Sequence, residues 1–163
     1  MSLPDWVPAE IPYADYGGDW DKFIEAVYTQ FKTDFLDELD QGRLAFDGVP
    51  LRLRKHPLVR GKESSFWHLV STGDIEDERL IDLDRCECIG RAKAILSNFS
   101  DPAVKRWENS RNGKTNVCLW LESENYLVVL GKRSGYYLLL TAYFANEYKR
   151  KNLLAEYKAY HGI

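Results

Sequence analysis

Apolar and polar residues alternate along two consecutive segments, residues 126–130 and 136–144, which are joined by Gly131-Lys132-Arg133-Ser134-Gly135. Alternation with a glycine-bearing connection is typical of a β-hairpin. One face of the second strand is predicted to join the core, and it comprises Tyr136, Leu138, Leu140, Ala142 and Phe144. The opposite face ends in two hydroxyl side chains, Thr141 and Tyr143, near Lys132 and Arg133. Either these polar groups bind a ligand, or they reflect strand propensity alone.

A different pattern, with apolar residues three and four positions apart, runs through residues 19–42. Its members are Phe23, Ile24, Val27, Phe31 and Phe35, which predict one long helix capped by Asp19. Three prolines precede it, so residues 1–18 are expected to form an extended arm. Shorter helical patterns cover residues 85–97 and 146–160, and the last of them carries basic residues on its exposed side.

The remaining patterns favour short strands between these helices. Asp47-Gly48 lies between apolar residues and indicates a tight hairpin, whose second strand is predicted to be an edge strand because it contains Pro50. Further strands are expected over residues 64–72, 104–109 and 115–121. The chain is therefore predicted to be one α+β domain, 1–163. A mainly antiparallel sheet over residues 43–145 would carry an N-terminal long helix, a middle helix and a C-terminal helix.

His68 is the most informative single residue of this pattern, since the alternation places it inside the apolar strand predicted for residues 64–72. A neutral imidazole there must satisfy two ring nitrogens, and it can act as acid or base if it lines a cleft. A core histidine bonded to backbone is the structural alternative. His56 and His161 lie in looser surroundings and are weaker candidates.

Composition narrows the functional classes. The 163 residues include 45% hydrophobic and 29% charged residues, which is typical of a globular protein. Neither a membrane-spanning apolar run nor a secretory leader is apparent, so a cytoplasmic location is expected. Cys86, Cys88 and Cys118 lack the spacing of a zinc site and are interpreted as free thiols. No cofactor motif is recognised, and no metal or cofactor is predicted.

Charge is distributed unevenly along the chain. Residues 1–47 contain eleven acidic and three basic residues, whereas residues 91–163 contain twelve basic and six acidic ones. The basic part could face an anionic partner, or the two parts could pair across the fold. A second basic stretch, containing Arg52 and Arg54, either contacts phosphate or keeps an exposed strand soluble.

Three segments resemble a known group of enzymes. The three segments are F-W-H-L-V-S-T-G, W-E-N-S-R, and Y-Y-L-L-L-T-A-Y followed by the basic K-R-K-N-L-L-A-E-Y. They are similar to segments of phage- and prophage-associated proteins of the barnase, EndoU, colicin and RelE-like (BECR) ribonuclease superfamily. The resemblance covers roughly residues 44–160. It implies a helical N-terminal part packed on a curved antiparallel sheet whose concave face binds RNA.

The resemblance also implies a chemistry: the ribose 2′-hydroxyl attacks the adjacent phosphate without a metal ion and leaves a 2′,3′-cyclic phosphate. Such a reaction needs a base, an acid and cations near the phosphate. By resemblance, His68 is the base or acid, Tyr143 or Glu108 is its counterpart, and Thr141 positions the phosphate. The residues that would stabilise or bind the phosphate are Arg111, Arg133, Lys132, Lys114, Arg52 and Arg54.

Two other functions remain open from the sequence. The basic face and aromatic residues could hold RNA without cutting it. Alternatively, the protein could be a phage-derived interaction partner whose acidic first helix docks on a basic protein. A toxin-like ribonuclease would have RNA as substrate and an antitoxin or immunity protein as partner.

Overall fold

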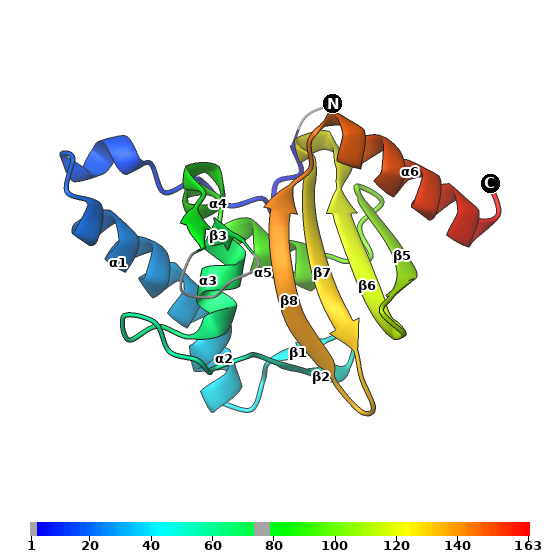
Figure 1. Ribbon diagram of the computed structural model, residues 1–163, viewed down its shortest axis with the longest axis horizontal. Coiled ribbons are helices and arrows are strands. Elements are labelled where there is room, and N and C mark those ends of the chain that lie inside the picture. Colours follow the sequence, from blue (N-terminus) through cyan, green and yellow to red (C-terminus); the bar gives the residue numbers. More distant parts are fainter. Residues whose placement is uncertain (1–2, 74–78) are drawn as a thin grey trace.

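The computed structural model describes residues 3–73 and 79–163 (Figure 1). The helices are α1 (Trp20–Phe31), α2 (Asp37–Asp40), α3 (Ser64–Val70), α4 (Leu83–Glu87), α5 (Gly90–Ser97) and α6 (Glu147–His161). The strands are β1 (Ala45–Phe46), β2 (Val49–Arg52), β3 (Ser71–Thr72), β4 (Leu80–Ile81), β5 (Val104–Arg111), β6 (Lys114–Leu121), β7 (Tyr126–Lys132) and β8 (Tyr137–Phe144). Short 3₁₀ turns cover Tyr13–Tyr16 and Glu122–Glu124.

Six of the strands form a curled sheet in the order β1-β2-β8-β7-β6-β5. Neighbouring strands are antiparallel except β2 and β8, which run parallel. Figure 1 shows α6 crossing the sheet near β5 and β6, α5 behind the sheet, α3 beside β8, and α1 on the far side of α3. The predicted α+β class and mainly antiparallel sheet are confirmed.

The long N-terminal helix is also confirmed. Residues 20–40 are continuously helical, with a π-helical segment over Lys32–Leu36 between α1 and α2. The Asp19 carboxylate accepts the backbone N–H of Lys22 at 3.1 Å, which is the predicted N-cap. Phe23, Val27 and Phe31 are buried, so the apolar stripe attaches this helix to the core.

The predicted strand over residues 64–72 is wrong, because residues 64–70 form α3 and only Ser71 and Thr72 form β3. Phe66, Leu69 and Val70 stand at the i, i+3 and i+4 positions of this helix and are buried. Over seven residues the same apolar positions fit both an alternating strand and a helical stripe, and tertiary packing decides between them. His68 consequently lies half-buried on a helix.

A β-bulge in β8 overturns part of the predicted alternation. Leu130 of β7 pairs with Leu139, but the preceding Val129 pairs with Thr141, which leaves Leu140 as an extra residue. One extra residue exchanges the two faces of the strand beyond it.

The consequence appears in the core. The β8 residues that pack in or against the main core are Tyr137, Leu139, Ala142 and Phe144. Tyr136, Leu138 and Leu140 were assigned to that face by strict alternation, and this assignment is wrong. Thr141 and Tyr143 follow the bulge and lie on the face opposite Ala142.

Pro50 does not mark the edge of the sheet. The hairpin around Asp47-Gly48 forms as predicted, but β2 pairs with β1 on one side and β8 on the other, so β1 is the edge strand at this end of the sheet. Only Leu51 and Arg52 pair with β8. Proline is tolerated here because its missing N–H falls outside the part of β2 that contacts β8.

Two hydrophobic clusters lie on the two faces of the sheet. The larger one joins the sheet to α1, α3 and α5. The smaller one lies under α6 and contains Trp107, Cys118, Trp120, Leu127, Ala145 and Leu153. The N-terminal arm is fixed to the body, because the Trp6 Nε1–H donates to Asp101 Oδ2 at 2.9 Å and the Ile11 N–H donates to the Glu87 carbonyl at 2.8 Å.

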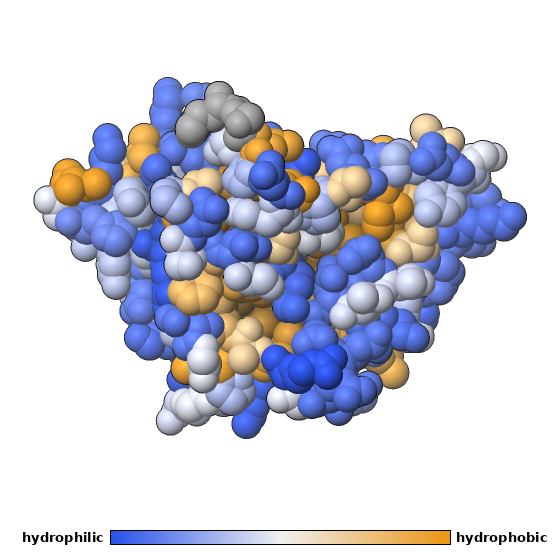
Figure 2. Space-filling model, turned by 180° about the vertical axis from the view of Figure 1, so that it is seen from behind, coloured by the Kyte–Doolittle hydropathy of each residue, from blue (hydrophilic) through white to orange (hydrophobic). Residues whose placement is uncertain are grey.

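The surface is mostly polar. Seen from behind, hydrophilic residues dominate and hydrophobic ones gather in small groups between them (Figure 2). Among the helices of the described residues, none has the length and apolar character needed to cross a membrane.

Candidate functional site

A polar hollow lies where α6 meets the sheet, and we call it the β8–α6 hollow. It has a volume of about 160 Å³. Its lining residues are Asn109, Arg111, Asn116, Cys118, Leu127, Val129, Thr141, Tyr143, Lys149 and Leu153. Each of β5, β6, β7 and β8 contributes two residues separated by one position, so the lining is a single face of the sheet. Arg111, Thr141 and Tyr143 are thus brought together.

A second hollow of about 320 Å³ adjoins the first and shares Tyr143 and Lys149 with it. Arg85 of α4 and Asn146, the N-cap of α6, also line it. The Asn146 side chain accepts the backbone N–H of Lys149 at 2.8 Å. Helix N-termini favour anions, so the start of α6 adds to the positive character given by Arg85 and Lys149.

Arg85 is the most enclosed cation of this region. Its Nη1 donates to the Ser71 carbonyl at 2.7 Å, and its guanidinium carbon lies 5.5 Å from the centre of the Tyr143 ring. Burial lowers the pKa of Arg85, although Asp82 counteracts this effect. An arginine with a lowered pKa still carries its charge at neutral pH. A permanent positive charge therefore faces Tyr143.

Tyr143 is a proton donor rather than a base at neutral pH. Burial, with a smaller contribution from Cys118, raises its pKa to about 12, and this outweighs the opposite effect of Arg85 and Arg111. Its hydroxyl forms no hydrogen bond within residues 3–73 and 79–163 and is open to a ligand.

Thr141 connects the hollow to α3. Its hydroxyl donates to the backbone carbonyl of His68 at 2.9 Å, and so the histidine predicted from the sequence stands next to the predicted threonine. The residues lining the hollow do not include His68. The structure therefore joins Thr141 to the main chain of His68, and a role for the imidazole stays a prediction.

Glu156 of α6 is a central residue that the sequence did not indicate. Its carboxylate accepts hydrogen bonds from Trp107 Nε1 at 3.1 Å, from Asn109 Nδ2 at 3.0 Å and from Arg111 Nη2. This clasp fixes α6 on β5 and orients Arg111 at the rim of the hollow. Burial acts to raise the pKa of Glu156, but the three hydrogen bonds and the Arg111 charge outweigh it and lower the pKa.

The lowered pKa of Glu156 leads to a prediction about pH and stability. An unfolded glutamate titrates near pH 4.3, and the folded-state pKa lies below that value. The stabilisation is therefore complete above about pH 4.3 and is lost as the pH falls through the folded pKa. Glu156→Gln is expected to lower the free energy of unfolding by about 1–2 kcal/mol at pH 7. In urea titrations the difference from wild type should shrink toward zero in acid.

The exposed carboxylate Asp40 supplies the control for this experiment. Asp40→Asn should change the unfolding free energy by less than about 0.5 kcal/mol at either pH. A Glu156→Gln effect that stays constant down to pH 3 would contradict the charged clasp.

Glu108 does not join the cluster. It alternates with Trp107 and Asn109 along β5 and therefore lies on the opposite face, where it pairs with Lys132 at 3.1 Å. Glu108 therefore does not line the β8–α6 hollow, and its role as the counterpart of His68 stays a prediction.

The other predicted phosphate-binding residues are spread along the sheet ends. Arg52 stacks over the Tyr136 ring, with 4.1 Å between the guanidinium carbon and the ring centre. The Arg133 guanidinium lies against Gly131, and Lys114 is exposed at the start of β6. Arg54 has an exposed side chain, and its N–H donates to Ser65 Oγ at 2.7 Å. None of these four lines the β8–α6 hollow.

Sequence reasoning missed Lys149 and Glu156, although a signal exists. Lys149, Leu153 and Glu156 stand at i, i+4 and i+7 on α6, so one helix face carries a cation, an apolar anchor and an anion. Asn109 and Asn116 could have been found in the same way, as alternate positions of the strands that carry Arg111 and Cys118.

Within residues 3–73 and 79–163, the cysteines and acidic residues form no further site. Cys86, Cys88 and Cys118 are buried free thiols, and burial raises the pKa of each to about 12. Thiols with such values carry little reactive thiolate at neutral pH. Within the described parts of the chain, no group of three or more His, Cys, Asp or Glu side chains is arranged to hold a metal ion.

Comparison with known proteins adds no relative. The chain matches no protein-family model, no curated protein and no solved structure with which it was compared.

Proposed function

We propose that the protein binds RNA at the β8–α6 hollow and cleaves it by a metal-independent transesterification, as expected for the BECR ribonucleases that the sequence resembles. The observation that carries this proposal is the convergence of Arg111, Thr141 and Tyr143 around one hollow. Arg85 and Lys149 add two cations from separate helices. Cations and hydroxyl donors on one strand face are suited to a phosphodiester.

Each group has a role in this chemistry. Lys149, Arg111 and the α6 N-terminus would hold the phosphate oxygens and stabilise the charge that develops on them. Tyr143 stays protonated at neutral pH because its pKa is about 12, so it would donate to the phosphate or the leaving oxygen. His68, held beside Thr141 by its main chain, would accept the 2′-hydroxyl proton. In this transesterification the 2′-oxygen forms a bond to phosphorus, the bond between phosphorus and the 5′-oxygen breaks, and the 5′-oxygen receives a proton.

RNA binding without cleavage is the second candidate, and one observation favours it. The carboxylate nearest Arg111, that of Glu156, is engaged by three hydrogen-bond donors and has a lowered pKa. It is therefore a poor general base. If His68 does not supply that function, the hollow holds RNA and leaves it intact.

The product ends of an RNA digest distinguish the two candidates. Purified protein is incubated with total RNA in excess EDTA, and fragment ends are analysed for 2′,3′-cyclic phosphate. Wild type should produce such ends, and His68→Ala should not. His56→Ala, which changes a histidine of an exposed loop, serves as the control and should cleave normally. Retarded migration of intact RNA on a native gel would support binding alone. If wild type neither cleaves nor binds RNA, the proposal is rejected.

A further inference from the structure

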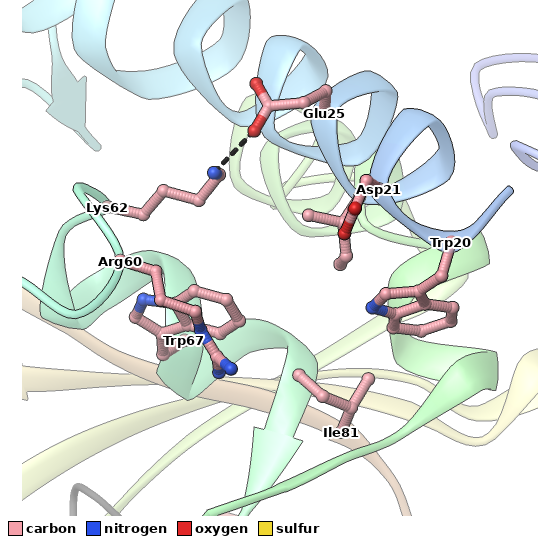
Figure 3. A pocket seen from close by; sticks show the side chains of 8 residues that line it. Trp20, Asp21, Glu25, Arg60, Lys62, Trp67 and Ile81 are labelled. Atoms are coloured by element: carbon pink, nitrogen blue, oxygen red, sulfur yellow. Dashed lines mark hydrogen bonds and ion pairs between the residues drawn. The ribbon is translucent and has the colours of Figure 1, made fainter.

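A separate cavity of about 300 Å³ lies between α1, the turn at residues 59–62, α3 and β4 (Figure 3). Its lining residues are Trp20, Asp21, Ile24, Glu25, Arg60, Lys62, Trp67 and Ile81. None of them lines the β8–α6 hollow. This volume is at the lower end of the range of small-molecule pockets, roughly 300–1,000 Å³.

The walls of the cavity are aromatic and aliphatic. Figure 3 shows the indole rings of Trp20 and Trp67 on opposite sides, with Ile81 below them. The Trp20 indole nitrogen is turned toward the inside of the cavity, and 37% of this residue's surface is exposed. Tryptophan side chains with open surface offer a large apolar area together with one hydrogen-bond donor. The cavity therefore suits a ligand with an apolar body.

The basic wall is held in place before any ligand binds. Val59 and Lys62 exchange two backbone hydrogen bonds of 3.0 Å across Arg60 and Gly61, which both have positive φ angles. This geometry is that of a tight hairpin turn. The Trp67 Nε1–H donates to the Val59 carbonyl at 2.9 Å and attaches the turn to α3. Pre-organisation of this kind lowers the cost of binding.

Among the described residues, one cation and one anion at the rim of the cavity have no ion-pair partner. Lys62 Nζ pairs with Glu25 Oε1 at 2.5 Å, so these two charges satisfy each other (Figure 3). Arg60 stacks on Trp67, with its guanidinium carbon 4.8 Å from the ring centre. Neither Arg60 nor Asp21 forms an ion pair within residues 3–73 and 79–163. Figure 3 shows Arg60 and Asp21 on opposite sides of the cavity.

We infer that this cavity binds a small zwitterion with an apolar body, namely a free hydrophobic amino acid such as phenylalanine or leucine. Its carboxylate would pair with Arg60, its ammonium group with Asp21, and its side chain would lie between Trp20 and Trp67 over Ile81. An aromatic or branched side chain fills the apolar part, and the two opposite charges match the two unpaired groups on the rim.

The test follows the indole N–H signals of ¹⁵N-tryptophan-labelled protein in two-dimensional NMR, with Trp20 assigned by Trp20→Phe. L-Phenylalanine should shift the Trp20 signal saturably. N-Acetyl-L-phenylalanine lacks the ammonium charge and L-phenylalaninamide lacks the carboxylate, so each should bind at least tenfold more weakly.

Two variants match the two ligand derivatives. Asp21→Asn should bind L-phenylalanine and its N-acetyl form equally, and Arg60→Gln should bind L-phenylalanine and its amide equally. Asp40→Asn should behave as wild type in every titration, and thermal melts verify that all variants fold. The inference would be overturned if Asp21→Asn and Arg60→Gln still preferred L-phenylalanine over the two derivatives by the same factors as wild type. So would an absence of saturable shifts with L-phenylalanine at 20 mM, or equal binding of all three ligands by wild type.

Discussion

Tyr143→Phe is expected to reduce the rate of RNA cleavage by about 10²–10⁴-fold, the contribution typical of a positioned proton donor. The substitution removes one hydroxyl and keeps the half-buried ring against Arg85. Because the pKa of Tyr143 is raised to about 12, the phenol stays protonated over the neutral range, and its loss should lower the rate at every pH between 6 and 9. The measurement is single-turnover cleavage of a labelled RNA in EDTA.

Tyr148 supplies a matched control for this variant. It lies on α6 close to Lys149, but 76% of its surface is exposed, and it lines neither hollow. Tyr148→Phe should therefore cleave at the wild-type rate. Equal rates for Tyr143→Phe and wild type, with native-like melts, would remove Tyr143 from the mechanism. A loss of RNA binding in Tyr143→Phe would assign its hydroxyl to phosphate recognition rather than to proton transfer.

Arg91→Met is expected to lower the free energy of unfolding by about 2 kcal/mol, because it removes the charge-assisted hydrogen bond between a buried arginine and Glu124. Arg91 has 7% of its side chain exposed, and its Nη1 lies 2.7 Å from Glu124 Oε1. Its Nη2 lies 3.5 Å from Glu10 Oε1, which joins the N-terminal arm to the β6–β7 connection. Methionine retains the length of the side chain and removes the charge. Urea denaturation measures the change, and the Tm should fall by roughly 6 °C.

Arg43→Met tests whether burial is the cause. Arg43 also forms an ion pair, with its Nη2 2.8 Å from Glu38 Oε1, but 60% of its side chain is exposed. Exposed ion pairs contribute little to stability because water screens them, so Arg43→Met should be nearly neutral. Similar losses in both variants would mean that burial does not decide the strength of these pairs. A stable Arg91→Met would mean that hydrophobic replacement compensates for the lost pair.

Part of the candidate site could be predicted from the sequence. Thr141 and Tyr143 stand out because they are polar residues in an apolar strand, and Arg111 lies at the end of a recognisable strand. All three line the β8–α6 hollow. The same reasoning predicted Glu108 to be part of the site, but Glu108 lies on the other face of β5, since neighbouring strand residues point to opposite faces. Glu108 is therefore close to Arg111 in the sequence but faces away from the hollow that Arg111 lines.

Residues that reach the site from another element were harder to predict. Glu156 meets Trp107, Asn109 and Arg111 only because α6 packs across β5. A sequence pattern indicates which face of a helix is apolar, but it does not determine which strand that face covers.

The sequence by itself determined the elements whose patterns are long and regular. The helical period is repeated often enough over residues 20–40 and in α6 to exclude a strand. The glycine-bearing connection at residues 131–135 between two apolar runs indicates the β7–β8 hairpin. Local backbone preferences and side-chain spacing are sufficient in these segments. The same patterns determined the α+β class.

Only the tertiary structure decided the short or interrupted segments and the assembly of the hollows. Packing beside β8 makes residues 64–70 a helix, and the bulge at Leu140 exchanges the faces of β8. The cavity between Trp20 and Trp67 exists because α1 and α3 are placed side by side with the 59–62 turn. Such features depend on contacts between residues far apart in the chain, and no local periodicity encodes them.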